Sequence, residues 1–182
     1  MALLLACSAT IAAADQTDKR LDALFTRLKE TKTPDVARSV TSEIWSIWLD
    51  SNDGVSDEMM HRGVAAMRAE RHDLALNQFD LLVKHVPKFA EGWNKRATVL
   101  YALGQFQSSI DDIKRVLALE PRHFGALSGL GMCYEALGEE EAARDAYKLA
   151  LSANPHLSRI RERIEHLQEQ VRRKNIIYND RY

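Results

Sequence analysis

The segment LSGLGMCYEALGEEEAARDAYKLALSANP, residues 127–155, reads as two amphipathic helices joined by a short break. In its first half, apolar side chains recur every three or four positions, which is the period of one helix face. They are Leu127, Leu130, Tyr134 and Leu137. Gly138 follows directly, and glycine commonly ends a helix because it adopts a left-handed backbone without steric cost. A second apolar face then runs to Pro155. The segment therefore predicts a helical hairpin.

The same layout occurs twice more upstream, at a constant period. Pro87, Pro121 and Pro155 recur with a 34-residue period. When the chain is aligned on these prolines, two columns hold only small residues and a third holds large apolar ones. The columns are Gly63, Ala97 and Gly131; Ala75, Ser109 and Ala143; and Phe79, Ile113 and Tyr147. Periods of this length mark repeat architectures. We predict repeated hairpins over 56–89, 90–123 and 124–157.

The small residues of these columns have a packing explanation. Two antiparallel helices joined by a short loop can approach closely only where glycine, alanine or serine replaces a larger side chain. A leucine at Gly131 is therefore expected to overpack its hairpin. Cys133 is a lone thiol in an apolar helix, and we expect it to serve packing rather than chemistry.

Together these positions resemble the tetratricopeptide repeat, a helix–turn–helix motif with the same period. The matching positions are Gly63, Ala75, Phe79, Pro87, Trp93, Gly104, Pro121, Gly131, Tyr134, Gly138, Ala143, Tyr147 and Pro155. The resemblance covers about residues 56–157. It implies an all-α fold of helical hairpins stacked as a right-handed superhelix with a concave binding groove. This chain departs from the family pattern at Arg96-Ala97, in place of Leu-Gly, and at Glu70, in place of the glycine between the helices.

The flanking segments are also expected to be helical. Thr33-Pro34-Asp35 is a helix start with apolar faces on either side of it. Residues 15–55 are therefore predicted to form a degenerate hairpin that caps the N-terminal end of the stack, and Ser56 is expected to cap the next helix. Residues 158–174 are predicted to form a C-terminal capping helix whose apolar stripe covers the last repeat. Residues 175–182 are expected to form a loose tail.

The N-terminal stretch 1–14 is uncharged and largely apolar, and Ala-x-Ala precedes Asp15. This pattern is typical of a signal peptide cleaved after Ala14, although no Lys or Arg precedes the apolar core. The interpretation predicts an exported, periplasmic protein. Leu4-Leu5-Ala6-Cys7 also resembles a bacterial lipoprotein box, which would place a lipid anchor at Cys7. A cytoplasmic location is the third alternative.

The charge balance excludes some classes of function. The chain of 182 residues carries 25 Lys and Arg against 26 Asp and Glu. A nucleic-acid binder would need a basic face, so no nucleic-acid partner is expected. The neutrality is an average, because Lys and Arg outnumber Glu between Arg159 and Lys174.

A search for chemistry finds no catalytic constellation. Asp50-Ser51-Asn52-Asp53-Gly54 superficially resembles a calcium loop, but its glycine is out of place and His61 stands at position 12. The six histidines show no i, i+4 pair and no cysteine spacing suited to zinc. Glu139-Glu140-Glu141 begins a helix, where acids favour the helix dipole. The sequence therefore predicts no enzyme, no small-molecule substrate, no cofactor and no metal.

The resemblance implies that the first helix of each repeat lines the binding groove. The candidates are Met60, His61, Val64, Met67, Asn94, Lys95, Thr98, Tyr101, Ser128, Gly129, Met132 and Glu135. Some members of the family hold a peptide carboxylate with a clamp of Lys, Arg and Asn. Here only Asn94 and Lys95 fit such a clamp, and Gly125 and Gly129 stand in the third repeat, which disfavours it. Alternatively, the methionines fill gaps between repeats.

The resulting hypothesis is a protein-interaction adaptor or scaffold that binds a peptide or helix of a partner protein in the groove. The alternative is a self-assembling structural module of the cell envelope. In that case the C-terminal stripe and the region around Trp45 and Trp48 would pair between copies.

Overall fold

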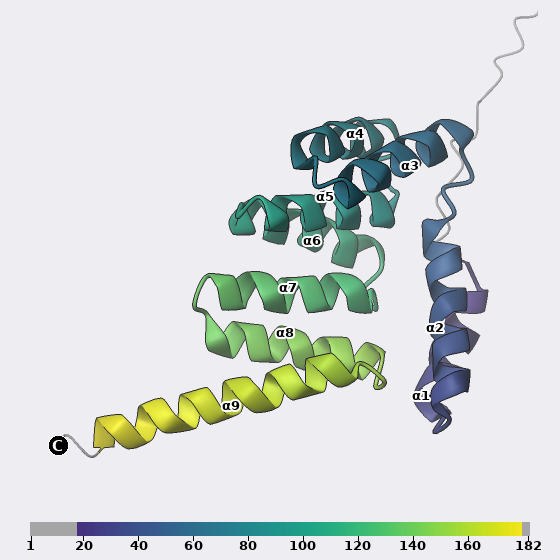
Figure 1. The fold of residues 1–182 in the computed structure, drawn as a ribbon. Coiled ribbons are helices and arrows are strands. Elements are labelled where there is room, and N and C mark those ends of the chain that lie inside the picture. Colours follow the sequence, from purple (N-terminus) through teal and green to yellow (C-terminus); the bar gives the residue numbers. More distant parts are fainter. Residues whose placement is uncertain (1–17, 180–182) are drawn as a thin grey trace, which may run out of the picture.

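The computed structural model describes residues 18–179, and every regular element in that range is an α-helix (Figure 1). The helices are α1 (Arg20–Glu30), α2 (Pro34–Leu49), α3 (Gly54–Arg68), α4 (His72–His85), α5 (Ala90–Ala102), α6 (Phe106–Leu119), α7 (Phe124–Ala136), α8 (Glu140–Ala153) and α9 (Ser158–Asn179). Within this range no helix is both long enough and apolar enough to cross a bilayer. The predicted signal peptide, with Cys7, lies outside the described residues.

Three antiparallel hairpins, α3–α4, α5–α6 and α7–α8, stack in chain order (Figure 1). Each second helix packs on the first helix of the next hairpin. The helices α5, α7 and α9 begin at Ala90, Phe124 and Ser158, so successive starts are one 34-residue period apart. Helix α9 therefore stands where the first helix of a further repeat would stand. The all-α fold of stacked hairpins is as predicted.

The small residues lie where the two helices of a hairpin approach most closely. A β-carbon on Gly63 would lie 2.5 Å from Cε1 of Phe79, and one on Gly131 would overlap the ring of Tyr147. Ala75 and Ala143 are fully buried. The close approach predicted from the columns is confirmed. It explains why an aromatic ring in the second helix requires glycine in the first.

The middle repeat carries polar groups in this interface. The Ser109 hydroxyl donates to the carbonyl of Ala97 at 2.8 Å, and the Cys133 thiol donates to Ser109 at 3.3 Å. Burial raises the pKa of Cys133. The buried thiol thus serves packing, as expected.

Arg96, which departs from the family pattern, links two repeats. Its guanidinium binds both carboxylate oxygens of Asp112, at 2.7 and 2.6 Å, and Asp80 of α4 at 2.9 Å. It also lies 4.7 Å from the centre of the Trp93 ring. The hydrogen bonds to Asp112 raise the pKa of Arg96. A bidentate ion pair thus stands where the third repeat has Leu130.

The turns between paired helices share one backbone conformation. Gly104 and Gly138 have φ values of 74° and 77°, and Glu70, at the equivalent position, has a φ of 56°. In each turn the next residue donates its N–H to a carbonyl five positions back, as from Arg71 to Ala66 at 2.9 Å. This is the Schellman helix end. Glu70 is therefore a side-chain-bearing residue at a position that suits glycine.

Replacing Glu70 with glycine is expected to raise the free energy of unfolding by about 0.5–1 kcal/mol, because the left-handed conformation strains any residue with a β-carbon. Urea denaturation measures the change. The matched substitution Gly104→Ala should lower the free energy of unfolding by a similar amount. A lower midpoint for Glu70→Gly would contradict this account of the turn.

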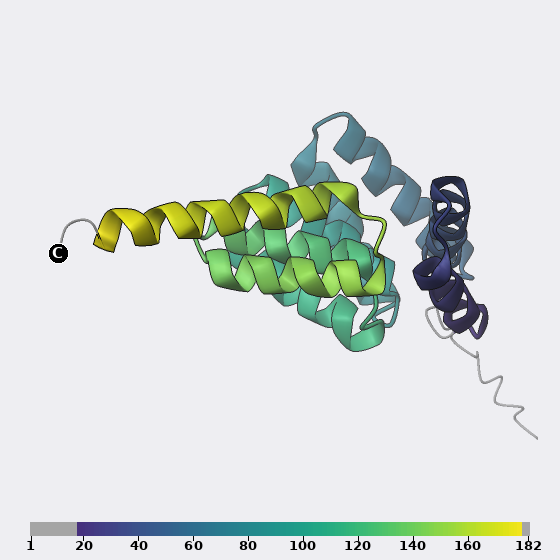
Figure 2. The same cartoon turned by 90° about the horizontal axis from the view of Figure 1, so that it is seen from below.

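The N-terminal hairpin α1–α2 does not cap the first repeat, which corrects that prediction. It lies across the edge of the stack where one repeat connects to the next, as both views show (Figures 1 and 2). Apolar residues of α1 and α2, among them Phe25 and Trp48, form one core with Phe124 and Leu127 of α7 and with α8. The predicted apolar faces of the hairpin are buried, but against a different partner.

Polar contacts from the repeat connections hold the hairpin in place. Arg122, between α6 and α7, binds Asp22 at 2.6 Å and lies 4.4 Å from the centre of the Phe25 ring. His156, one period further on, lies 2.9 Å from the carbonyl of Leu28 through Nε2. Two equivalent loops thus hold the two ends of α1.

The first repeat protects its own outer face, which is why it needs no cap. Glu58 and Ala65 of α3 are exposed, whereas their counterparts in later repeats are buried. Those counterparts are Gly92, Ala126, Val99 and Cys133. Glu58 also pairs with Arg62 at 2.6 Å. The pair of Glu58 and Arg62 therefore makes this terminal face partly polar, which favours solubility in repeat arrays, although Val55 on the same helix is 53% exposed.

Two helix ends also differ from the predictions. The N-cap of α3 is Asp53, whose carboxylate accepts from the N–H and hydroxyl of Ser56 at 2.9 and 2.6 Å, so Ser56 is the donor rather than the cap. Helix α9 continues to Asn179 instead of ending at 174. It buries Ile164 and Leu167 against Ala143 and Tyr147, and its second half projects past α8 (Figure 2). The side chain of Val171 lies outside the described part.

Candidate functional site

The first helices of the repeats line two adjoining cavities. One, of about 160 Å³, lies between α5 and α7. The other, of about 470 Å³, lies between α7 and α9, and both are lined by Tyr101 and Met132. We call their combined surface the concave groove. It brings together seven of the twelve predicted residues: Asn94, Thr98, Tyr101, Ser128, Gly129, Met132 and Glu135.

The middle of the concave groove has an uncharged floor of small residues. The hydroxyl of Thr98 donates to the carbonyl of Asn94 at 2.9 Å, and that of Ser128 donates to Phe124 at 2.7 Å. Both hydroxyl groups thus donate within their own helices, while their oxygen lone pairs remain able to accept hydrogen bonds. Gly129 has no side chain, and Met132 is 42% exposed. This floor allows a backbone to approach closely and offers a flexible apolar contact.

The α9 end of the concave groove is charged. The Glu135 carboxylate accepts from the Tyr147 hydroxyl at 2.6 Å and from Nε of Arg163 at 2.6 Å. Burial, followed by the hydrogen bond to Glu135, raises the pKa of Tyr147. Arg159 lines the same cavity and is exposed. This end of the groove therefore has two arginines, Arg159 and Arg163, and one carboxylate, Glu135, whose charge Arg163 already compensates.

The sequence interpretation missed Arg159, Ile160 and Arg163 as groove residues. The 34-residue period could have identified them, because α9 continues the series of first helices. Arg163 stands one period after Gly129 and two after Lys95. The sequence predicts only a capping role for this segment, whereas in the structure it also lines a cavity of the concave groove.

The four candidates in the first repeat do not join this groove. Met60 is only 6% exposed and packs in the core with Phe79 and Leu82, and Val64 and Met67 pack against the same cluster. His61 is exposed but lines neither cavity. The alternative that methionines fill gaps is correct for Met60 and Met67. The physical reason lies in the side chains, since the long apolar side chain of Met60 packs in an apolar cluster, whereas its counterpart Asn94 binds the Glu91 carboxylate.

Asn94 and Lys95 do not form a carboxylate clamp for a partner, because a carboxylate of the chain itself engages them. Glu91 is fully buried, and its oxygens lie 2.8 Å from Nδ2 of Asn94 and 2.8 Å from Nζ of Lys95. Nε2 of His123 donates to Glu91 at 3.1 Å, because Nδ1 accepts from the N–H of Ala126. We call the side chains of Glu91, Asn94, Lys95 and His123 the Glu91 network. Lys95 is therefore structural.

The Glu91 network also determines the charge of its carboxylate. Burial raises the pKa of Glu91, but the hydrogen bond from His123 and the charge of Lys95 outweigh it, so the pKa lies below its ordinary value. Glu91 is thus an anion in a buried site, compensated by the ammonium of Lys95. Such a group destabilises the fold strongly if its partners are removed.

The Glu91 network joins the N-terminal hairpin to the repeats. The Trp48 ring stacks on His123 with centroids 4.1 Å apart, and Nζ of Lys95 lies 5.8 Å from the centre of the Trp45 ring. A β-carbon on Gly125 would lie 2.8 Å from Trp45. The start of α7 therefore carries glycine where the tryptophan of α2 packs.

Comparison with known proteins agrees with this architecture. The model of the tetratricopeptide repeat family matches residues 60–111 and 94–158. A TPR repeat-containing protein of Rhizobium etli is 35% identical over 153 residues, which are 84% of this chain and 75% of that protein.

Two solved structures share the fold. The Sgt2 TPR domain from Aspergillus fumigatus is 21% identical, with a TM-score of 0.64 over 68% of this chain and 83% of that one. The first TPR of Spaghetti (RPAP3), bound to the HSP90 peptide SRMEEVD, is 18% identical, with a TM-score of 0.62 over 64% and 92%.

Proposed function

Since the chain belongs to the tetratricopeptide repeat family, we propose that it is a non-catalytic adaptor that binds a peptide or helix of a partner protein in the concave groove. The observation that carries the proposal is the continuity of this groove from α5 across α7 to α9, with Tyr101 and Met132 lining both of its cavities. The peptide bound to the RPAP3 domain supports it as a precedent for the fold.

The lining suggests what the partner presents. Gly129 leaves room for a backbone, and the half-buried ring of Tyr101 with the exposed Met132 offers a contact for an apolar side chain. Arg159 and Arg163 would favour an acidic group at the α9 end. A short segment with one apolar anchor fits this arrangement better than a flat protein surface does.

Filling the groove is expected to abolish partner binding. Thr98 is exposed on α5 and lines the floor, so Thr98→Trp should place a large ring over it without disturbing the core. Recovery of cross-linked partners, quantified by mass spectrometry, should fall by about tenfold or more.

The matched control for this prediction is Ser108→Trp. It adds the same ring at an exposed position on α6, the other helix of the same repeat. Melting curves should show both variants folded. If Thr98→Trp recovers the same proteins at the same level as Ser108→Trp, the groove is not the binding site. Lys95 is unsuitable for such a test, because its replacement would disturb the Glu91 network.

A further inference from the structure

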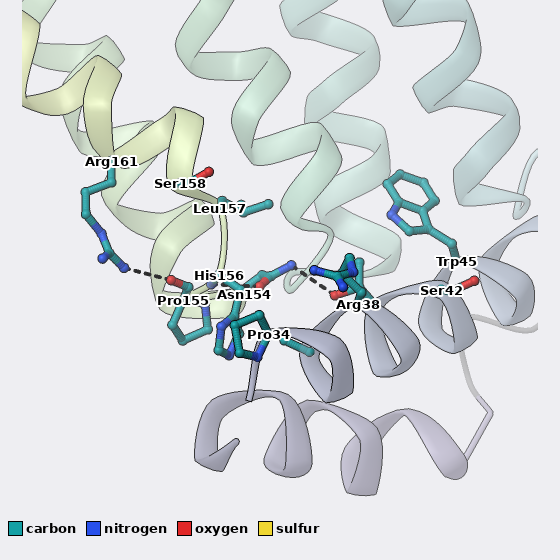
Figure 3. A pocket seen from close by; sticks show the side chains of 12 residues that line it. Pro34, Arg38, Ser42, Trp45, Asn154, Pro155, His156, Leu157, Ser158 and Arg161 are labelled. Atoms are coloured by element: carbon teal, nitrogen blue, oxygen red, sulfur yellow. Dashed lines mark hydrogen bonds between the residues drawn. The ribbon is translucent and has the colours of Figure 1, made fainter. Parts of the chain in front are cut away.

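A second depression lies on the edge of the molecule, between α2 and the loop that joins α8 to α9 (Figure 3). Its volume is about 830 Å³, and we call it the edge trench. It exists because α1–α2 docks across the repeat connections instead of capping the stack. It shares no lining residue with either cavity of the concave groove.

One wall of the edge trench is a single face of α2. Pro34, Ala37, Thr41 and Trp45 line it, and their spacing of three and four positions places them along one side of the helix. This wall is about 16 Å long at 1.5 Å per residue, which is about the length of five extended residues. The adjoining face of α2 buries Val40 and Ile44 in the core, and Ala37, which is 2% exposed, lies where the two faces meet. Helix α2 therefore has one face for the fold and a second, half-apolar face along an open trench.

The opposite wall is apolar at its centre and firmly held. Pro155 and Leu157 line it, and Asn154 reaches across to the hydroxyl of Thr41 at 3.5 Å (Figure 3). The His156 ring is tied to the carbonyl of Leu28. The trench thus lies between two segments that are already connected, so little ordering is needed before a ligand binds.

The charge of the edge trench has one sign. Its charged lining residues are Arg38 and Arg161, and none of the lining residues carries a carboxylate. Arg161 uses one N–H on the carbonyl of Pro155 at 2.8 Å. Arg38 pairs with Asp35, but both side chains are more than two-thirds exposed, and such pairs contribute little. Helix α9 begins here, and its N-terminal dipole adds to the positive potential.

We propose that the edge trench is a second docking site, which binds an extended acidic segment of a partner protein. The two arginines would pair with carboxylates of the segment, and its apolar side chains would contact Leu157 between them and Trp45 beyond Arg38 (Figure 3). Guanidinium groups bind carboxylates bidentately, and a proline- and tryptophan-lined wall suits an extended chain. The inference does not depend on what binds in the concave groove.

The test uses the full chain with two synthetic, fluorescein-labelled peptide pools of about eight residues. In one pool glutamates alternate with random Leu, Pro and Ser, and in the other glutamines replace the glutamates. Fluorescence anisotropy should show the acidic pool binding about tenfold or more tightly, with the difference shrinking at high salt. Absence of binding by the acidic pool at low salt would contradict the proposal.

Variants locate the binding. The double variant Arg38→Gln/Arg161→Gln should weaken binding of the acidic pool by about tenfold or more. The matched control Arg62→Gln/Arg173→Gln removes two exposed, ion-paired arginines from α3 and α9, and should leave binding unchanged. Equal weakening by both doubles would mean non-specific attraction and would overturn the proposal.

Two further measurements distinguish binding in the edge trench from binding in the concave groove and from pairing of two copies of the chain. Thr98→Trp should leave binding of the acidic pool unchanged; if it abolishes binding while the trench double does not, the peptide lies in the concave groove and the edge trench is not a docking site. Light scattering without peptide should show no dimer that depends on Arg38 and Arg161. A dimer lost in their double variant would make a second copy the occupant and overturn the proposal.

Discussion

Glu91→Ala is expected to lower the free energy of unfolding by about 3–5 kcal/mol, because it leaves a buried network without its anion. His123 would lose the acceptor for Nε2, Asn94 the acceptor for its amide, and Lys95 its counter-ion. All three groups contact the Glu91 carboxylate in the folded protein. Its removal would leave them without the partner that compensates for their lost contact with water. The loss should also loosen the N-terminal hairpin, because Trp48 stacks on His123.

Guanidinium denaturation followed by tryptophan fluorescence measures both effects. The matched control is Glu58→Ala, which removes an exposed carboxylate paired with Arg62 at the same i, i+4 spacing as Glu91 and Lys95. That change should cost about 0.5 kcal/mol or less. If the two variants unfold at the same midpoint, the Glu91 network contributes nothing beyond a surface ion pair.

The lowered pKa of Glu91 adds a pH dependence. The folded pKa lies below the ordinary value of 4.5. The unfolded chain therefore binds a proton first, and the carboxylate contributes its full stability above about pH 4.5. This contribution is lost as the pH falls through the lower, folded value. Wild type should consequently lose more stability than Glu91→Gln between about pH 5 and pH 3. Parallel curves would indicate that Glu91 does not titrate differently in the two states.

Gly131→Leu is expected to lower the free energy of unfolding by about 1–3 kcal/mol or more through overpacking. The space a β-carbon would need is occupied by the ring of Tyr147, which is buried and holds Glu135 through its hydroxyl. To admit a side chain, the hairpin α7–α8 must separate or the ring must leave its site. Either change opens the core between the last repeat and α9.

Thermal melting tests this expectation, with Gly129→Ala as the control. A β-carbon on Gly129 would make an ordinary contact with Ile113 at 3.5 Å, so this change should be neutral or slightly stabilising. A rescue is also available, because the middle repeat combines Ala97 with Ile113. Gly131→Ala with Tyr147→Ile should cost less than the sum of the single changes. An unchanged midpoint for Gly131→Leu would contradict the close approach of the two helices.

The candidate site was only partly predictable. The groove residues of α5 and α7 were found because repeat register places equivalent positions on one surface, whatever their chemistry. The prediction for Met60 was wrong because repeat register does not say how far a side chain reaches. The long side chain of Met60 packs in the core instead of lining the groove. The prediction of Lys95 as a groove residue failed for a related reason. His123 belongs to the connection before α7 and stands in no register with Lys95, so only the folded chain shows that Glu91 engages both.

The 34-residue period was enough to predict the helices, their pairing and the close approach of Gly131 to Tyr147. These features depend on contacts within a repeat or between neighbours, which sequence periodicity records directly. The position of α1–α2 is different. Its apolar faces showed that the hairpin must be buried. The hydrophobic effect has no direction, however, so these faces did not determine which surface of the repeats the hairpin would cover. Only the tertiary structure decided between the polar end at Glu58 and the apolar edge at Phe124, and that choice created the edge trench.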